Sequence, residues 1–386
     1  MIKRDNYVSN EDWKKIKNFS EDLETPFLVV NLSHIKKKYE ELIANFPYAK
    51  IHYAVKANPA IEVLSLLRDL GSNFDVASVY ELRKLLSIGV TGDRISYGNT
   101  IKKATDIREH YEAGVRLYVT DSEPDLRNIA KAAPGSKVLV RILVEGLETA
   151  DWPLSRKFGC QTDMAGDLII LAQKLGLHPC GISFHVGSQQ RDIATWDAAI
   201  SKVSYVFNWL EEEGINLDMI NMGGGFPASY VSRTNDLKIY AEEITRYLVE
   251  DFGDNLPDII LEPGRSLVAD AGVLVSEVVL ISRKSRHALN RWVYTDVGKF
   301  SGLIETLDEA IKFPIFSERK SETEECVLAG PTCDSQDIMY ENHKYDLPLT
   351  LTIGDRLYWL STGAYTTSYS SIEFNGFPPL MTYFIE

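Results

Sequence analysis

The sequence predicts a (β/α)8 barrel followed by a mostly antiparallel β-sheet domain, and three observations support this prediction. Short apolar runs rich in β-branched and aromatic residues recur eight times between residues 50 and 262. The stretches between these runs have the apolar spacing of amphipathic helices. After about residue 270 most of the helical spacing disappears, and β-rich segments follow one another. Continuous apolar strands that alternate with amphipathic helices indicate parallel strands covered by helices.

The apolar runs are the expected barrel strands. They are KIHYAV (50–55), NFDVAS (73–78), RISYG (94–98), RLYVT (116–120), KVLVRILV (137–144), GISFHV (181–186), LDMINM (217–222) and DIILE (258–262). Stretches such as VYELRKLLSIG and LKIYAEEITRYLVEDF have helical spacing between them. Eight such units favour a closed barrel, with a doubly wound open sheet as the alternative architecture.

The remaining segments are expected to form a second domain. GVLVSEVVLISRK, RWVYTD, TEECVLAG, LPLTLTIGDRLYWLST and MTYFIE are all β-rich. The first thirty residues are polar and precede the first expected barrel helix, around HIKKKYEELIANF, so they could pair with this sheet. We therefore expect a barrel over residues 32–271 and a sheet domain formed by residues 1–31 and 272–386.

Composition excludes several classes of function. The chain has 386 residues, of which 45% are hydrophobic and 25% charged, and its net charge of −14 comes without a long basic run. That argues against nucleic-acid binding, which needs clustered Lys and Arg. Cys160, Cys180, Cys326 and Cys333 form no CxxC pair or other metal-ligand spacing, so we expect no metal site. The N-terminal segment has no apolar core and no stretch is long enough to cross a bilayer, so we expect a cytoplasmic protein without membrane partners.

Residues with chemically useful side chains fall at or near the ends of the expected strands. In chain order they are Lys56, Asp75, Arg141, His185, the Gly223–Gly225 run and Glu262, which accompany strands one, two, five, six, seven and eight. In a (β/α)8 barrel the carboxyl ends of the strands form the rim at which active sites lie. The fold and the candidate residues therefore support each other.

Lys56 and the glycine run suggest a covalently held anionic cofactor. An isolated lysine at a strand end is usually solvated or paired. Inside the mouth of a barrel, however, desolvation lowers the pKa of a lysine and frees its amine to attack a carbonyl carbon. The three glycines of GGGFP have no Cβ atoms, so their backbone N–H groups could bind a phosphate. A tight strand-to-helix turn is the alternative interpretation.

Other candidates divide in the same way between a chemical role and a structural one. In LEPGRSL, Glu262 could hold a ring nitrogen protonated and Arg265 could pair with a phosphate, or the two could cap a turn. His185 is either a buried core histidine or a flat ring that stacks on a cofactor, with Ser188 near a phosphate. Cys333 and Asp334 lie in a Gly/Pro-bounded loop, where catalytic polar residues often occur. A buried, inert Cys333 is the alternative.

Together these motifs resemble a known family. YAVKAN (53–58), FDVAS with Glu81 (74–81), SFHVGSQ (183–189), GGGFP (223–227), EPGR (262–265), GPTCDSQD (330–337) and GAYTTSYSSIEFNGF (363–377) occur in the order seen in eukaryotic-type ornithine decarboxylases and their relatives, the alanine-racemase-fold pyridoxal-phosphate enzymes. The resemblance covers nearly the whole chain. It implies a barrel followed by a β-sheet domain that recruits the N-terminal segment, pyridoxal 5′-phosphate (PLP) as cofactor, and a head-to-tail homodimer with two active sites at its interface.

The resemblance also implies roles for single residues. Lys56 would carry the cofactor, His185 would stack on its ring, and Glu262 would pair with the pyridine nitrogen. The residues that would hold the phosphate are Ser188, Gly224, Gly225, Arg265 and Tyr365. Those at cofactor-proximal positions are Asp75 and Arg141, with Glu81 in support. Cys333 matches the residue that protonates the substrate carbon after carbon dioxide leaves, and Asp334 matches a carboxylate that binds the distal amine from across the dimer interface. Asp308, in ETLDEAIKFP (305–314), matches a second such carboxylate, although its surroundings depart from the eukaryotic pattern.

The implied activity is that of a PLP-dependent carboxy-lyase. Alanine racemases place an arginine where this chain has Glu262, which weakens the electron sink, so the sequence indicates a decarboxylase. Asp334 and Asp308 favour a basic diamino acid, with ornithine first, lysine second and arginine less favoured, which implies polyamine biosynthesis. Two alternatives stay open: a diaminopimelate decarboxylase, whose motif usually has Cys-Glu in place of Cys333-Asp334, and a catalytically silent PLP-binding regulator.

Overall fold

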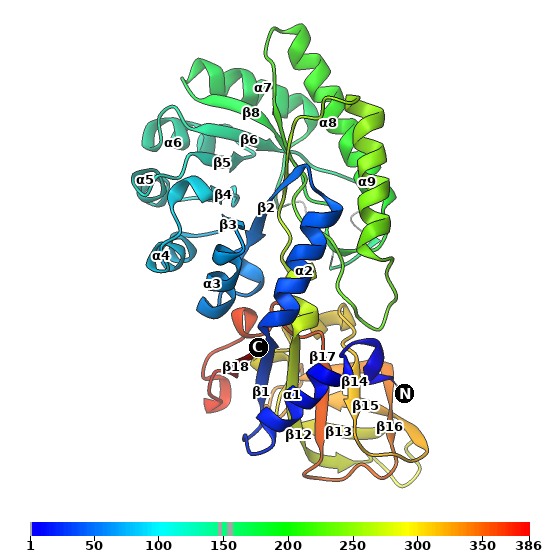
Figure 1. Ribbon diagram of the computed structural model, residues 1–386. Coiled ribbons are helices and arrows are strands. Elements are labelled where there is room, and N and C mark those ends of the chain that lie inside the picture. Colours follow the sequence, from blue (N-terminus) through cyan, green and yellow to red (C-terminus); the bar gives the residue numbers. More distant parts are fainter. Residues whose placement is uncertain (1, 146–148, 153–156) are drawn as a thin grey trace. The chain divides into compact units, whose positions relative to one another are not determined.

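The computed structural model describes residues 2–145, 149–152 and 157–386 (Figure 1). Its described residues divide into two compact units. The barrel unit comprises the described residues within 38–227 and residues 235–264, and the sheet unit comprises residues 2–37, 228–234 and 265–386. The short segment 228–234 was expected in the barrel but packs with the sheet unit, where the backbone N–H of Val231 donates to the carbonyl of Lys312 at 3.1 Å. No described helix is long and apolar enough to cross a membrane.

The barrel unit is built on a closed parallel barrel, which confirms the predicted fold. Its strands, in order around the barrel, are β2 (Ala49–Ala54), β3 (Asn73–Val76), β4 (Ile95–Tyr97), β5 (Leu117–Thr120), β6 (Lys137–Arg141), β8 (His178–Ser183), β10 (Met219–Asn221) and β11 (Asp258–Leu261). β11 pairs with β2 to close the ring. Every expected barrel strand is therefore present, although each is shorter than or shifted slightly from its apolar run.

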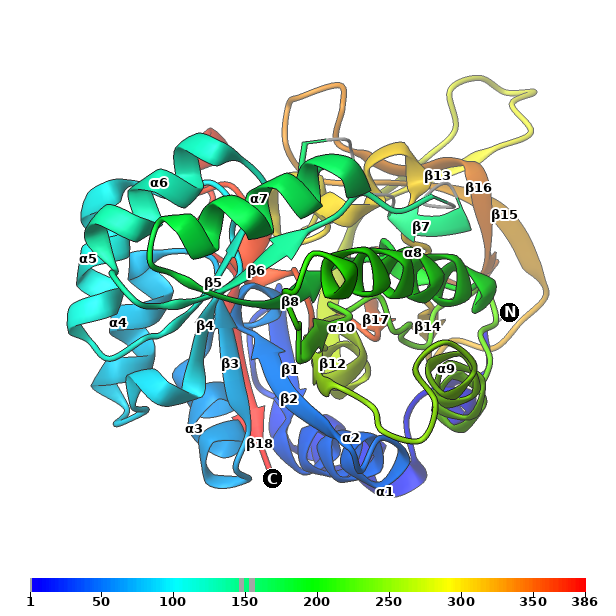
Figure 2. The same cartoon turned by 90° about the horizontal axis from the view of Figure 1, so that it is seen from above.

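Helices lie outside the barrel strands (Figures 1 and 2). They are α3 (Ile61–Asp69), α4 (Val79–Ser87), α5 (Ala104–Glu112), α6 (Glu123–Ala132), α7 (Thr162–Lys174), α8 (Ala194–Glu212) and α9 (Leu237–Phe252), while α2 (Leu32–Asn45) precedes β2. Local sequence explains where some of them begin. The hydroxyl of Ser78 accepts the N–H of Glu81 and caps α4, and α6 has a proline in its first turn. Inside the barrel, apolar side chains such as Leu139, Met219 and Ile260 pack into one cluster.

The sheet unit contains an eight-stranded, mostly antiparallel sheet. Its main path is β14 (Ile315–Ser317), β17 (Arg356–Leu360), β12 (Gly272–Ser282), β13 (Arg291–Thr295), β15 (Thr323–Ala329) and β16 (Ile338–Pro348). β1 (Phe27–Asn31) pairs antiparallel with β12 and parallel with β18 (Met381–Ile385). The N-terminal segment therefore joins this sheet, as predicted.

An N-terminal helix covers part of the sheet. α1 (Asn10–Ser20) buries Trp13 and Ile16 against a cluster that includes Val273 and Tyr358. Ser9 caps this helix by accepting the N–H of Asp12 at 3.1 Å. Because α1 shares its apolar core with β12 and β17, it is an integral part of the sheet unit.

Candidate active site

The barrel unit contains a cavity of about 250 Å³ at the carboxyl ends of its strands. It brings together five residues predicted from sequence: Lys56, Asp75, Arg141, His185 and Glu262. The other lining residues were not predicted, and they are Ala77, Gly98, Asn99, Val119, Phe158, Ser183 and Phe184. The cavity therefore lies where a (β/α)8 barrel places its active site.

Lys56 and Asp75 come from neighbouring strands. Lys56 lies in the 3-10 turn η2 (Val55–Ala57), directly after β2, and Asp75 lies in β3. Burial raises the pKa of Asp75 well above its ordinary value, the charge of Glu262 raises it further, and Lys56 opposes the shift. Gly98 leaves room for this carboxylate, since a Cβ there would lie 2.2 Å from an Asp75 oxygen.

His185 is fixed as a neutral ring. The backbone N–H of Gly187 donates to its Nδ1 at 3.0 Å, so the neutral imidazole carries its proton on Nε2. Burial lowers the pKa of His185 well below its ordinary value, and the charges of Arg141 and Lys56 lower it further. A neutral flat ring in a cavity suits stacking on an aromatic cofactor.

Glu262 is oriented by a residue that sequence analysis missed. The amide Nδ2 of Asn221 donates to the Glu262 carboxylate at 2.5 Å, and Oδ1 of Asn221 accepts the N–H of Gly223 at 2.9 Å. Asn221 is fully buried at the end of β10. Asn221 therefore links Glu262 to the start of the glycine run. Its position shortly before that run was the only sequence signal of this supporting role.

The glycine run is required by close backbone approach. A Cβ on Gly224 would lie 2.6 Å from the carbonyl oxygen of Glu262. Gly225 has a φ of +101°, and its Cβ would lie 2.7 Å from the carbonyl oxygen of Gly187. The N–H of Gln190 donates to the Gly225 carbonyl at 2.9 Å. Gln190 ends β9 (Ser188–Gln190), so Ser188 begins the short strand that fixes the glycine run.

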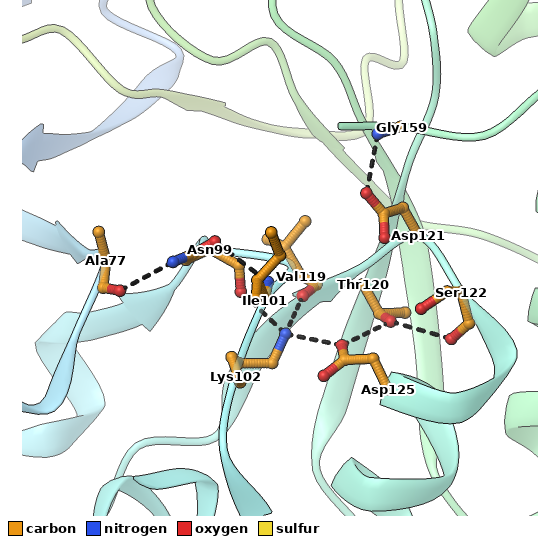
Figure 3. A network of polar contacts seen from close by, with 10 residues as sticks. All are labelled: Ala77, Asn99, Ile101, Lys102, Val119, Thr120, Asp121, Ser122, Asp125 and Gly159. Atoms are coloured by element: carbon orange, nitrogen blue, oxygen red, sulfur yellow. Dashed lines mark hydrogen bonds and ion pairs between the residues drawn. The ribbon is translucent and has the colours of Figure 1, made fainter. Parts of the chain in front are cut away.

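Lys102 is a buried lysine whose hydrogen bonds to two residues of the cavity lining, Asn99 and Val119, are drawn in Figure 3. Nζ of Lys102 donates to the carbonyls of Asn99 and Val119, at 2.8 and 2.7 Å, and to Asp125 at 2.7 Å. The side chains of Lys102 and Asp125 are 0% and 9% exposed. Asn99 in turn donates to the carbonyl of Ala77 at 3.0 Å. Lys102 thus joins two residues of the cavity lining directly, and Asn99 connects the third, Ala77; Lys102 itself is not part of the lining.

A second contact in the same network holds the wall near Arg141. The Asp121 carboxylate accepts the N–H of Gly159 at 2.8 Å (Figure 3). The neighbouring ring of Phe158 lies 5.1 Å from the Arg141 guanidinium carbon, at cation–π distance. Glu81 has a related supporting position, because its carboxylate accepts the N–H of Ala77 at 2.6 Å from the first turn of α4.

In the sheet unit, Arg265 lies among aromatic side chains and one carboxylate. Its guanidinium carbon is 4.8 Å from the ring of Tyr365, which has a φ of 55°, and it donates to Tyr230 at 2.9 Å. It also donates two hydrogen bonds to Glu305. Glu305 was missed in the sequence although it opens the quoted segment ETLDEAIKFP. The phosphate-binding role of Arg265 stays a prediction, and in this structure the charge of its guanidinium group is neutralised by Glu305.

Cys333 and Asp334 lie in an exposed loop of the sheet unit. Cys333 is exposed, which overturns the alternative of a buried, inert thiol, while the other three cysteines are buried. Asp337 organises this loop from its buried position: its carboxylate accepts the N–H groups of Lys299 and Thr332 at 2.8 and 3.0 Å. Asp337 belonged to the quoted GPTCDSQD motif, but nothing in the sequence distinguished its role from that of Asp334.

Asp308 is an exposed residue in η7 (Ile304–Glu309). Its backbone is left-handed, with a φ of 53° and a ψ of 20°. The candidate substrate carboxylates Asp308 and Asp334 are therefore both exposed within the sheet unit.

Comparison with known proteins identifies the family. Residues 32–269 match the family described as pyridoxal-dependent decarboxylase, pyridoxal binding domain. The chain belongs to this family. It is 34% identical to the lysine/ornithine decarboxylase of Selenomonas ruminantium, over 94% of this chain and 90% of that protein. It is 32% identical to the ornithine decarboxylase of Schizosaccharomyces pombe, over 91% and 81%.

The fold is shared with solved structures of the family. The lysine/ornithine decarboxylase of Vibrio vulnificus complexed with cadaverine has a TM-score of 0.87 and 28% identity to this chain, with coverage of 98% of this chain and 100% of that one. PLP is the cofactor of this family.

The barrel cavity of this decarboxylase fits PLP. Lys56, His185 and Glu262 line one cavity. They offer an amine for the aldehyde of PLP, a flat neutral ring for stacking, and a carboxylate for the pyridine nitrogen. The glycine run supplies backbone where any Cβ would be excluded, which suits a phosphate. Lys56, His185, Glu262, Gly224 and Gly225 are therefore the barrel residues that would hold the cofactor.

Proposed function

We propose that this chain is a PLP-dependent decarboxylase of basic diamino acids, which converts L-ornithine to putrescine and also accepts L-lysine, giving cadaverine. The observation that carries the proposal is the carboxylate of Glu262, held by Asn221 in the same cavity as Lys56 and His185. When bound, PLP supplies an electron sink, and a carboxylate that keeps its ring nitrogen protonated strengthens that sink. The relatives that act on lysine and ornithine support the choice of substrate.

The barrel residues have separate tasks in this proposal. Lys56 would hold the cofactor between turnovers, and the substrate amine would replace it when substrate binds. Neutral His185 packs its ring against the cofactor without adding charge. Glu262 holds a proton at the pyridine nitrogen, and the amide of Asn221 keeps its carboxylate oriented. Backbone N–H groups at Gly224 and Gly225 bind the phosphate.

The sheet-unit residues supply proton transfer and substrate choice. The exposed thiol of Cys333 delivers a proton to the substrate carbon after carbon dioxide leaves. The carboxylates of Asp308 and Asp334 bind the distal ammonium group of the substrate. Arg265 and Tyr365, which lie against each other, contribute to phosphate binding together with Ser188. A homodimer with active sites at its interface and a place in polyamine biosynthesis complete the proposal and rest on the family resemblance. The proposed cytoplasmic location rests on the N-terminal segment without an apolar core and on the lack of a bilayer-spanning stretch.

The test is a comparison of kcat/KM for ornithine, lysine, arginine and meso-diaminopimelate, together with the visible absorbance of the purified protein. We expect a yellow protein whose band borohydride bleaches, with ornithine and lysine as the best substrates. One methylene in a partly polar pocket discriminates by only about 1–3 kcal/mol, so both should react. Failure on both would overturn the substrate assignment, and preference for meso-diaminopimelate would establish the rival activity. A protein without a cofactor band would contradict the enzyme assignment.

A further inference from the structure

A strained turn presents Asp308. Asp308 and Glu309 are consecutive residues with φ values of 53° and 56°. Non-glycine residues rarely adopt this left-handed conformation, and two in succession persist only where the surrounding structure imposes them.

Glu309 is the anchor of this turn. Its carboxylate accepts three consecutive backbone N–H groups of β16: Oε1 accepts those of Glu341 and Asn342, at 2.7 and 2.6 Å, and Oε2 accepts that of His343 at 2.7 Å. Partial burial raises the pKa of Glu309, but these N–H groups outweigh burial and lower the pKa overall. The ionised carboxylate of Glu309 therefore clamps the turn to β16, and its negative charge is compensated by these backbone N–H groups.

The chain on both sides of the turn is fixed as well. Downstream, the hydroxyl of Tyr340 donates to the carbonyl of Ile311 at 2.7 Å and accepts the N–H of Phe313 at 3.0 Å. Upstream, Glu305, four residues before Glu309, is held by Arg265. Asp308 is therefore the exposed tip of a segment clamped at both ends.

The two neighbouring carboxylates have opposite surroundings. Glu309 is enclosed by donors, whereas Asp308 is exposed, and no hydrogen bond or ion pair to its side chain is found among the described residues. A carboxylate that is rigidly held but not neutralised is pre-oriented for an incoming cation, which reduces the entropy lost on binding.

We propose that Glu309 is a positioning residue for substrate selection: by clamping the turn to β16 it holds the Asp308 carboxylate at a fixed point, and so sets the length of diamino acid that the enzyme prefers. This inference rests on the proposed function, because it assumes that Asp308 meets the distal ammonium group. A rigid counter-charge favours one chain length, whereas a loose one follows the ammonium group of either substrate.

The test compares Glu309→Ala, Glu309→Gln and Asp308→Ala, with Glu341→Gln as the matched control. The control removes an exposed carboxylate from the same corner but keeps its backbone N–H. For each variant, kcat and KM are measured on ornithine and lysine, with the cofactor band and the melting temperature. We expect Glu309→Ala to raise KM about tenfold, as loss of charge-assisted hydrogen bonds implies, with kcat nearly unchanged and the band intact. The ratio of kcat/KM between the two substrates should move towards unity.

Two further results should follow from the clamp. Glu309→Gln should be intermediate, because its amide oxygen still accepts the N–H groups of Glu341 and Asn342. In the Asp308→Ala background, Glu309→Ala should add little to KM, since the group that it positions is gone.

Each contrary outcome has a separate meaning. Unchanged KM values and substrate ratio in Glu309→Ala, with raised KM in Asp308→Ala, would overturn the inference and leave the proposed function standing. A full additive effect in the double variant, or parallel loss of kcat, cofactor band and melting temperature, would reduce Glu309 to a structural role and also overturn the inference. A wild-type protein that decarboxylates neither diamino acid would instead defeat the proposed function.

Discussion

Arg265 and Glu305 form a buried, bidentate ion pair, with N–O distances of 2.5 and 2.6 Å and side chains that are each 3% exposed. Burial lowers the pKa of Arg265, but Glu305, Tyr230 and Tyr365 outweigh it and hold the pKa well above its ordinary value. Removing one partner of such a pair leaves an uncompensated buried charge. The pair therefore ties η7 to the start of α10 (Arg265–Val268).

We expect Glu305→Gln to lower the free energy of unfolding by about 3–5 kcal/mol, as is typical for breaking one side of a buried pair. Denaturant unfolding followed by fluorescence would measure this change. Asp258→Asn is the control, because it breaks the exposed Lys50–Asp258 pair and should change stability by less than about 1 kcal/mol. If Glu305→Gln and Asp258→Asn lowered the free energy of unfolding by similarly small amounts, the Arg265–Glu305 pair would not stabilise the fold as proposed.

Lys102 should be essential for the cavity wall although it takes no part in the chemistry. Burial lowers its pKa, and Asp125 opposes that shift. Lys102→Met leaves Asp125 buried without its partner and should cost about 3–5 kcal/mol in unfolding free energy. The double variant Lys102→Met/Asp125→Leu should recover much of this loss, because both charges are then removed. A double variant as unstable as the single one would contradict this account of the network in Figure 3.

Asn221→Ala should weaken cofactor binding. The variant removes the donor to Glu262 and the acceptor for the N–H of Gly223. A lost hydrogen bond to a charged group is worth about 1.5–3 kcal/mol, so the Kd for PLP should rise by roughly tenfold or more. Titration of the apoprotein with PLP, followed by absorbance, measures this. The exposed Asn255→Ala variant is the control and should bind PLP as the wild type does.

Stability should fall in acid through buried neutral histidines. Burial, and secondarily the charge of Lys50, lowers the pKa of His52 from 6.5 to about 4. Because the folded pKa lies below the unfolded value, the stabilising contribution is present above pH 6.5 and is lost as the pH falls to about 4. For His52 this loss is roughly 3 kcal/mol.

His52→Gln should therefore flatten the dependence of stability on pH within that window. Unfolding midpoints between pH 4 and 7, compared with those of the exposed His178→Gln variant, would measure the difference. An unchanged slope in His52→Gln would show that His52 is not buried as a neutral ring. The opposite pKa shift of Asp75 is common to both proteins and cancels in the comparison.

The barrel and its rim residues could be predicted because both leave local signals. Parallel strands buried on both faces appear as apolar runs, and Lys56, His185 and Glu262 each lie at or directly after the end of such a run. The supporting residues could not be predicted in the same way. Asn221 contacts Glu262 across 41 positions of chain, and Arg265 contacts Glu305 across 40, so their roles depend on tertiary structure. Similarly, α1 was read as a polar segment, since its apolar face becomes evident only beside the sheet.

The most direct test of the central claim is to reduce the purified protein with borohydride, map the modified lysine by peptide mass spectrometry, and measure carbon dioxide release from L-ornithine. We predict that the cofactor is fixed to Lys56 and that activity falls in proportion to that modification. Cofactor fixed to another lysine, or full modification of Lys56 with activity retained, would contradict the assignment of Lys56 as the residue on which decarboxylation depends.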